Sequence, residues 1–365
     1  MTKNKNRLGP NGKQTKISLK IRRDIRNGIY APGEKLPPRT ELEQEYASST
    51  VTVQKAFDKL KEDGYIYSDG PKGTFVAKNP PCFSNYAIVF PHHLKEYDEK
   101  VSFYGELKEL SQSIKKSDCY FTIYTGLNGH VDELDYVRLC DDVKADRLAG
   151  IIFATDPSLI QETPLFKKII NNKYLPKVAF MGRPVYPEIP TIKQVDQITK
   201  IFDFLEKNKV ERLAVITYQQ DVVDHNHFST YHEEEIFRLA KARNIDLPKY
   251  NFQVRHPALA VRTRDLSHLL LKGEAKDRPQ ALWIANDSLV EGATKGIVDA
   301  GLKVPEDLIV ISHCNFPKKS KSFVNTYWYG LDVNDFINLA LDILNRQTRG
   351  KAVQSIYVLE NKYYL

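Results

Sequence analysis

The chain has 365 residues, of which 42% are hydrophobic, enough for two or three domains with cores of their own. No run of about 18 uncharged apolar residues occurs and the N-terminus is polar, so we expect a cytoplasmic protein without a membrane span or a secretion signal. The formal net charge of +7 resides in residues 1–80, which hold 16 Lys and Arg against 9 Asp and Glu. A basic excess at one end of a chain predicts a polyanionic partner for that end.

The first segments combine polar stretches with short helical patterns. Residues 1–14 are polar and lack periodicity, and we expect a disordered tail. Residues 15–27 show a loosely helical spacing of Ile and Leu, and a turn-rich connector containing Pro32-Gly33 follows. A short helix is predicted from about Arg39 to Tyr46.

A second helix follows a two-residue turn, with Ser49 as a suitable N-cap. Its apolar positions recur at i, i+3, i+4 and i+7, and Gly64 ends it; they are Val53, Ala56, Phe57 and Leu60. Residues 65–68 and 74–77 read as two strands joined by a glycine-rich tip. Residues 15–77 therefore predict a winged helix-turn-helix, and the Pro-containing residues 78–84 predict a linker.

This arrangement has a direct physical use on DNA. An α-helix fits the major groove, and its N-terminus points backbone N–H groups at phosphates. Glycine at the wing tip lets the backbone come close to a phosphate or the minor groove. We therefore expect DNA contacts from the outer face of the second helix and from the wing tip, namely Ser49, Thr50, Thr52, Gln54, Lys55, Lys72 and Gly73.

Residues 25–76 resemble the GntR-type winged helix. The resemblance lies in G-x-Y-x-P-G-E-K-L-P (28–37), S-x-x-T-V (49–53) and G-T-F-V (73–76). Many members of that family carry three DNA-contacting arginines, and the matching positions here hold Thr40, Thr50 and Gln54. Arg39 and Lys55 stand beside two of these positions and are candidate substitutes. The resemblance therefore implies double-stranded DNA as the partner, and an operator unlike the common one of the family.

Beyond the linker, short β-branched runs alternate with amphipathic helices. The runs are YAIVF, YFTIYT, GIIFAT, KVAFMG, RLAVIT, ALWIAN and LIVISH. Apolar strands alternating with helices indicate parallel, doubly wound sheets. Because the runs are too many for one sheet, residues 85–365 predict a two-lobed α/β domain.

Residues 281–312 resemble the LacI-type effector module, which shares its fold with periplasmic sugar-binding proteins. The matching steps are A-N-D (285–287), A-G-L (300–302) and V-P-E-D (304–307). An N-terminal GntR-type winged helix followed by a LacI-type effector domain is similar to the arabinose-repressor type of regulator. That resemblance implies a repressor, a homodimer, a palindromic operator and a small-molecule inducer, commonly a sugar.

The resembled fold has two lobes joined by crossovers, with a ligand at the carboxyl ends of the strands. We expect the first lobe at about 85–194 and 330–350, and the second at about 195–328 and 351–365. The crossovers are then expected near 193–197, near 326–330 and at about 350. Closure of the lobes on a ligand would change the spacing of the two winged helices in a dimer.

Each effector-binding candidate has a simpler structural alternative. Asn286 and Asp287 follow a strand and suit sugar hydroxyls, or they cap the next helix, or both. Phe103 and Tyr104 open the first helix of the lobe, where an aromatic ring stacks on a sugar or packs into the core. Trp328 lies at an expected crossover and lines the cleft or packs the hinge.

Further candidates lie on loops or at positions that depart from the resembled family. Arg183 and Asp196 are on loops, and an exposed ion pair is their alternative role. His313 begins the triplet that corresponds to the aspartate step of the family. Tyr231 or His232 lies nearest to the position of the family's usual arginine. Because the usual carboxylate and arginine are missing, a non-sugar metabolite stays an alternative effector.

Other classes of function find little support in the sequence. His313 and Cys314 are adjacent on a predicted strand and point to opposite faces, so they cannot form a catalytic dyad, and no enzyme is expected. The cysteines are scattered, the histidines lack metal-ligand spacing, and no phosphate-binding glycine motif occurs, so neither a metal nor a cofactor is expected. A DNA-binding protein without ligand control is the remaining alternative.

Overall fold

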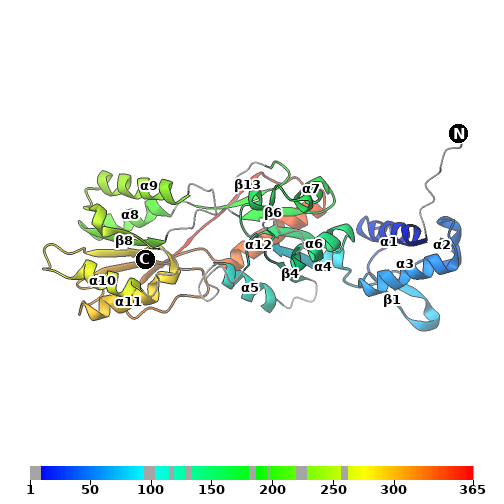
Figure 1. Cartoon of the computed structure of the whole chain (residues 1–365), viewed down its shortest axis with the longest axis horizontal. Coiled ribbons are helices and arrows are strands. Elements are labelled where there is room, and N and C mark those ends of the chain that lie inside the picture. Colours follow the sequence, from blue (N-terminus) through cyan, green and yellow to red (C-terminus); the bar gives the residue numbers. More distant parts are fainter. Residues whose placement is uncertain are drawn as a thin grey trace. The chain divides into compact units, whose positions relative to one another are not determined.

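The computed structural model describes residues 10–93, 103–114, 119–127, 133–180, 186–195, 197–218, 228–255 and 262–364. These residues form an N-terminal head and two six-stranded sheets with flanking helices (Figure 1). By their internal contacts they divide into two units, one within Met1–His92, Ser111–Val178 and Leu344–Ala352, the other within His93–Leu110, Ala179–Ile343 and Val353–Leu365. None of the helices in the described ranges is long and apolar enough to cross a membrane.

The head, residues 10–84, is built on three helices: α1 (Pro10–Arg26), α2 (Arg39–Glu45) and α3 (Thr50–Glu62). Its core joins Ile17, Ile21 and Ile25 of α1 to the four predicted apolar positions of α3. Helix α1 begins at Pro10, so the prediction of disorder is wrong for residues 10–14, and residues 1–9 lie outside the description. A packed helical stretch extends at little cost because each added residue gains one hydrogen bond.

The wing consists of β1 (Ile66–Ser68) and β2 (Thr74–Val76), which pair antiparallel around a short 3₁₀ turn at Gly70–Lys72. The segment predicted as a linker is partly a helix, α4 (Pro81–Ser84). Cys82 in α4 is only 2% exposed and belongs to the core of the head. A buried thiol behaves as a small apolar side chain, so this part of the linker is held by packing.

The first sheet has the strand order β13-β7-β6-β5-β3-β4. The neighbouring pairs β13–β7, β7–β6, β5–β3 and β3–β4 are parallel. The strands are β3 (Asn85–Val89), β4 (Tyr120–Tyr124), β5 (Gly150–Phe153), β6 (Lys177–Phe180), β7 (Thr191–Gln194) and β13 (Ile356–Leu359). The helices between or after them are α5 (Phe103–Ser113), α6 (Leu134–Lys144), α7 (Pro164–Asn171) and α12 (Val333–Thr348). We call this sheet with these helices the first lobe.

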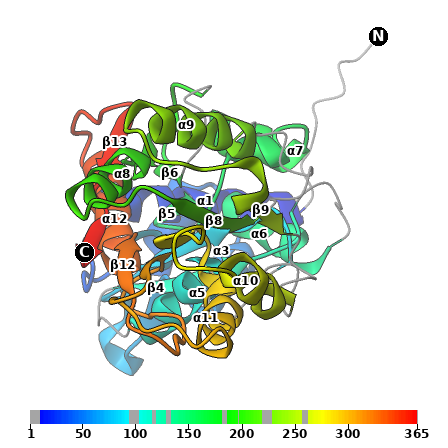
Figure 2. The same cartoon turned by 90° about the vertical axis from the view of Figure 1, so that its left-hand side faces the viewer.

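The second sheet has the order β14-β12-β11-β10-β8-β9, and we call it with its helices the second lobe. Its strands are β8 (Leu213–Tyr218), β9 (Phe252–Arg255), β10 (Ala281–Ile284), β11 (Ile309–His313), β12 (Tyr327–Gly330) and β14 (Lys362–Tyr364). One face packs on α8 (Ile198–Lys207) and α9 (Phe228–Ala242), the other on α10 (Thr263–Leu271) and α11 (Val290–Asp299). Figures 1 and 2 show these two pairs of helices on opposite sides of β8.

The C-terminal segment divides between the two sheets, contrary to the prediction that all of 351–365 lies in the second lobe. Strand β13 pairs in parallel with β7 of the first sheet, and β14 pairs antiparallel with β12 of the second. The last crossover is therefore at residues 360–361 and not at about 350. Period-two apolar patterns do not tell which of two sheets a strand joins, because they decide only which face of the strand is buried.

Candidate nucleic-acid interface and effector site

The N-terminus of α3 is fixed by its own side chains. Ser49 caps the helix, and its Oγ accepts a hydrogen bond from the backbone N–H of Thr52 at 3.4 Å. The hydroxyls of Ser49 and Thr52 also lie 3.0 Å apart. The cap satisfies one of the free N–H groups at the end of the helix, where the positive end of the helix dipole attracts phosphates.

Burial divides α3 into two faces, as the periodicity predicted. Val53, Ala56, Phe57 and Leu60 are at most 2% exposed and hold the helix against the head. On the other face Thr50 and Lys55 are exposed, and Thr52 and Gln54 are half-buried. The predicted contact residues of this helix therefore share one accessible face.

Helix α2 contributes to the same surface through Arg39 and Thr40, both exposed. The guanidinium of Arg39 donates a hydrogen bond to the side-chain oxygen of Gln54. The Gln54 amide in turn donates to Asp58 at 2.6 Å. Gln54 holds one of the positions where many members of the resembled family carry an arginine. Arg39 is held beside it by hydrogen bonds that continue along α3 to Asp58, so its guanidinium is a candidate substitute for that arginine.

The wing tip has the exposure and the backbone that close approach to DNA needs. Lys72 is exposed and pairs with Asp69 at 3.1 Å. Gly73 has φ +114, and a Cβ at this position would lie 2.7 Å from Cε of Lys35. The left-handed backbone therefore favours glycine, whereas the flexible Lys35 side chain can move away from an added Cβ.

Two exposed residues lie beside the predicted contacts: Val51, which helical periodicity already places on the outer face of α3, and Lys35, which the sequence did not single out. Val51 is 64% exposed on the outer face of α3, where an apolar side chain suits a thymine methyl group. Lys35 is exposed and its backbone bridges to Phe75 of the wing. The exposure of Val51 follows from the same helical periodicity, whereas the place of Lys35 depends on pairing between distant segments.

In the second lobe, Asn286 has the capping role that the sequence left open. Its side chain accepts hydrogen bonds from the backbone N–H of Ser288 at 2.9 Å and from the Ser288 hydroxyl at 2.6 Å. Asp287 is 5% exposed and accepts a hydrogen bond from Asn315 at 2.5 Å. The two residues therefore order the carboxyl ends of β10 and β11, and a ligand-binding role stays a prediction.

Phe103 and Tyr104, at the start of α5, form part of an aromatic cluster. Phe103 stacks on Phe180 with ring centroids 4.6 Å apart and meets Phe336 edge-on at 5.4 Å. Tyr104 meets Phe103 edge-on at 5.6 Å. Both rings are half-buried, so packing accounts for the buried part of each ring. Stacking of the accessible part on a ligand stays a prediction.

His313 ends β11, and burial lowers its pKa to about 4, so the imidazole is neutral at pH 7. Its ring meets Tyr329 edge-on at 5.5 Å. Next to it, burial raises the pKa of the Cys314 thiol to about 12, so this position carries no charge either. Trp328 is 8% exposed and belongs to the core of the second lobe. Of its two predicted roles, packing is the one that this burial supports.

The remaining candidates escape structural description. Arg183 and Asp196 lie outside the described residues, and Tyr231 lies in α9 with a side chain that is not described. Within the described ranges, no group of three or more His, Cys, Asp or Glu side chains is arranged to hold a metal ion.

Comparison with protein families matches both parts of the chain. Residues 13–76 match the gntR family of bacterial regulatory proteins, and residues 202–322 match the periplasmic binding protein-like domain. An uncharacterized HTH-type transcriptional regulator of Bacillus subtilis (strain 168), YurK, is 40% identical over 74 residues, which are 19% of this chain and 30% of that relative. This chain thus matches less than a third of the length of YurK.

Two longer matches extend through the lobes. The arabinose metabolism transcriptional repressor of Geobacillus stearothermophilus is 21% identical over 312 residues, or 80% of this chain and 79% of the relative. A LacI family transcriptional regulator from Lactobacillus casei, solved with bound sucrose, has a TM-score of 0.55 at 14% identity and covers 77% of this chain and 98% of that chain. At this identity the structural likeness shows the fold. The chain therefore carries an N-terminal DNA-binding domain of the gntR family of bacterial regulatory proteins, followed by a periplasmic-binding-protein-like domain of two α/β lobes.

Proposed function

We propose that this chain is a cytoplasmic transcriptional repressor that binds a palindromic operator as a homodimer and is released by a small effector. The accessible face of α3 carries the proposal. It presents a capped helix N-terminus, Thr50, Gln54 and Lys55 on a domain of the gntR family, while the opposite face is fully packed. The basic excess of the first 80 residues supplies the attraction to phosphates.

Base readout in this proposal centres on the pair of Arg39 and Gln54. Arginine reads guanine with two donors, and glutamine reads adenine with one donor and one acceptor. Because Arg39 donates to Gln54, the two side chains approach a base pair as one unit rather than as independent contacts. We expect a narrow preference at one operator position and fewer guanine contacts elsewhere.

The effector is proposed to be a carbohydrate that binds at the carboxyl ends of the strands. Support comes from the fold, which a sucrose-bound regulator shares, and from the Asn286 and Asp287 pair after β10. One observation favours a second candidate, a less polar metabolite: the triplet His313-Cys314-Asn315, which corresponds to the aspartate step of the resembled family, holds no carboxylate. Both classes therefore belong in a ligand screen.

Selection of duplexes from a random pool by the full-length chain tests the proposal. We expect enrichment of a two-fold symmetric sequence, followed by release of the labelled duplex by one member of a panel of pentoses, hexoses, deoxysugars and sugar phosphates. The same ligand should raise the melting temperature of the protein. A pool without any enriched sequence would contradict DNA recognition, and enrichment without release by any ligand would favour a DNA-binding protein without ligand control.

A further inference from the structure

The head continues into the first lobe without a free linker. Cys82 is buried in the core of the head, and β3 of the first sheet begins only three residues later, at Asn85. Ser84, between them, is 3% exposed, and its hydroxyl donates to the carbonyl of Pro80 at 3.0 Å. The covalent connection therefore offers little rotational freedom between these two parts of the chain.

Arg26, the last residue of α1, joins the head to loops of the first lobe. Its guanidinium donates to the carbonyl oxygens of Leu148 and Tyr174, each at 2.6 Å, and pairs with Asp146 at 3.0 Å. The side chain is 9% exposed. The hydroxyl of Tyr65, in the head, donates to the carbonyl of Asp146 as well. Planar guanidinium donors to fixed carbonyls define orientation as well as proximity.

Asp63, just after α3, is the centre of a second set of contacts. Its carboxylate accepts from Arg22 of α1 and from Arg147 of the first lobe, the latter at 2.7 Å. Arg147 also pairs with Asp142 of α6 at 2.7 Å, and Arg22 donates to the carbonyl of Ala145 at 2.7 Å. The side chains of Arg22 and Asp63 are 3% and 2% exposed. The ion pairs thus run continuously from the helix that carries the recognition face to α6.

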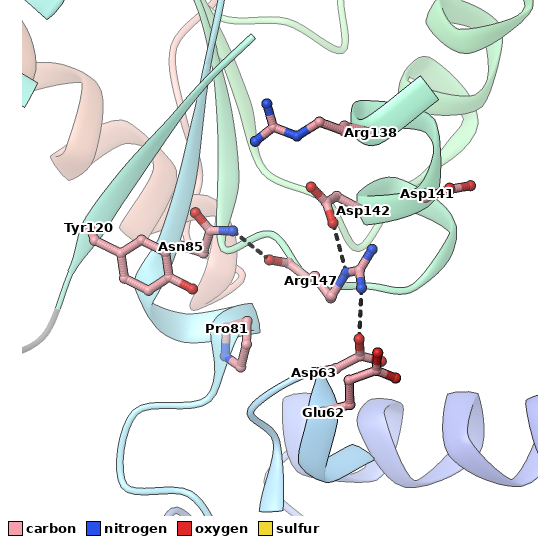
Figure 3. A pocket seen from close by; sticks show the side chains of 9 residues that line it. All are labelled: Glu62, Asp63, Pro81, Asn85, Tyr120, Arg138, Asp141, Asp142 and Arg147. Carbon is pink, nitrogen blue, oxygen red and sulfur yellow. Dashed lines mark hydrogen bonds and ion pairs between the residues drawn. The ribbon is translucent and has the colours of Figure 1, made fainter. Parts of the chain in front are cut away.

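A pocket of about 400 Å³ opens beside these contacts (Figure 3). Figure 3 shows Arg147 between Asp63 and Asp142 on one of its sides, with both ion pairs drawn. Because Arg147 is already held by Asp63 and Asp142, we assign the pocket to the open edge of the junction rather than to a ligand.

We infer that Arg22, Arg26, Asp63 and Arg147, which we call the clamp, lock the head and the adjoining part of the first lobe, namely β3, β4, β5, α6 and α7, into one rigid body in each chain. Buried ion pairs add little net stability, but they select one geometry, because a displaced partner leaves a charge without compensation. Resting on the proposed function, the consequence is that an effector moves α3 by moving this part of the first lobe, with no hinge between them. Rigid-body rotation is an established means of switching.

Distances between spin labels in the head and the first lobe test this directly, without DNA or ligand. We would place cysteines at two exposed positions, Q44C in α2 and K167C in α7, in a background with C119S and C140S. Double electron–electron resonance of the labelled full-length chain, mixed with an excess of unlabelled chain so that only distances within one chain are measured, should then give one narrow distance distribution. A broad or multiple distribution in this protein would overturn the inference.

R26A/R147A removes the contacts of Arg26 and Arg147 across the junction. It leaves the Arg22–Asp63 pair inside the head and the hydrogen bond from Arg22 to Ala145 in place. We expect the distance distribution to broaden and to extend to new distances. The matched control is R243A, because the ion-pair partners of Arg243, Asp203 and Glu206, lie in the second lobe. An unchanged distribution in R26A/R147A would overturn the inference.

A folding defect is recognised by far-UV circular dichroism and by thermal unfolding. The conservative pair R26K/R147K then replaces the alanine variant, because lysine keeps the charge but lacks the fork of donors. It should broaden the distribution less than alanine, and an unaltered width would again count against the clamp. Since these measurements use neither operator nor effector, their outcome is separate from that of the proposed function.

Discussion

Replacing Asp63 by Asn tests how much the stability of the head depends on one buried charge. Asp63 is 2% exposed at its side chain and accepts from Arg22 and Arg147, with Lys59 3.4 Å away. D63N keeps the shape but removes the charge, and Arg22, itself 3% exposed, loses its counter-ion. Breaking one side of a buried pair costs about 3–5 kcal/mol, a large part of the total stability of about 5–15 kcal/mol of an ordinary domain.

The two tryptophans make this loss measurable separately from the lobes. Trp283 and Trp328 both lie in the second sheet, so tryptophan fluorescence follows the second lobe, whereas far-UV circular dichroism includes the helices of the head. In urea, D63N should add an early transition in circular dichroism and leave the fluorescence transition unchanged. D203N is the matched control, because Asp203 is 58% exposed and its pair with Arg243 is worth about 1 kcal/mol or less.

The double variant D63L/R22M separates charge from packing. Replacing both partners of a buried pair by apolar groups of similar size is often close to neutral. It should therefore recover most of the stability that D63N loses. The reasoning is refuted if D63N unfolds within about 1 kcal/mol of the unchanged protein, or if the double variant is less stable than D63N.

Three further predictions address base readout, pH dependence and backbone strain. R39A should weaken operator binding by about 1–3 kcal/mol and relax the preference at one base pair, as measured by fluorescence anisotropy on single-base variants of the selected duplex; uniform weakening on all of them would count against base contact. Burial lowers the pKa of His313 from the ordinary 6.5 to about 4. As the pH falls below 6.5, the unfolded chain binds a proton at this residue before the folded chain does, so the free energy of unfolding declines. Between about pH 6.5 and 4 the free energy of unfolding should fall by about 3 kcal/mol through His313. Urea unfolding of H313N should lack this contribution, and an equal loss of stability in H313N and the unchanged chain would contradict the burial argument. Gly330 has φ +148 and an added Cβ would lie 2.0 Å from the carbonyl oxygen of Cys314, so G330A should lose about 2 kcal/mol or more in thermal unfolding; G350A, at φ +63 in open space, should lose less, and equal losses would refute the role of the contact.

Local patterns account for the parts of the structure that the sequence predicted well. The four apolar positions of α3 are all buried, because helical periodicity alone decides which face packs. The wing follows from two short strands around a glycine-rich tip, and Asn286 caps a turn as its residue type favours. The two parallel sheets likewise follow from apolar strands alternating with helices.

What the sequence did not predict depends on contacts between distant segments. The pair of Arg39 and Gln54, and the ion pairs of Asp63 with Arg22 and Arg147, join residues between 15 and 84 positions apart. Charged residues on amphipathic helices are mostly solvated, so nothing in the local pattern marks those that are buried. The division of the C-terminal segment between two sheets escaped prediction for a similar reason, since strand partners are set by tertiary packing.

The central claim is that the exposed N-terminal face of α3 binds DNA, and a salt titration of two matched variants tests it most directly. Lys55 and Lys61 are both exposed on α3, but Lys55 lies in the N-terminal half of the helix and Lys61 in its last turn. On the selected duplex, K55A should bind more weakly than the unchanged chain and lower the slope of log affinity against log salt by about 1, while K61A should leave both unchanged. Equal effects of the two substitutions, or an affinity of the full-length chain that does not depend on salt, would contradict the account.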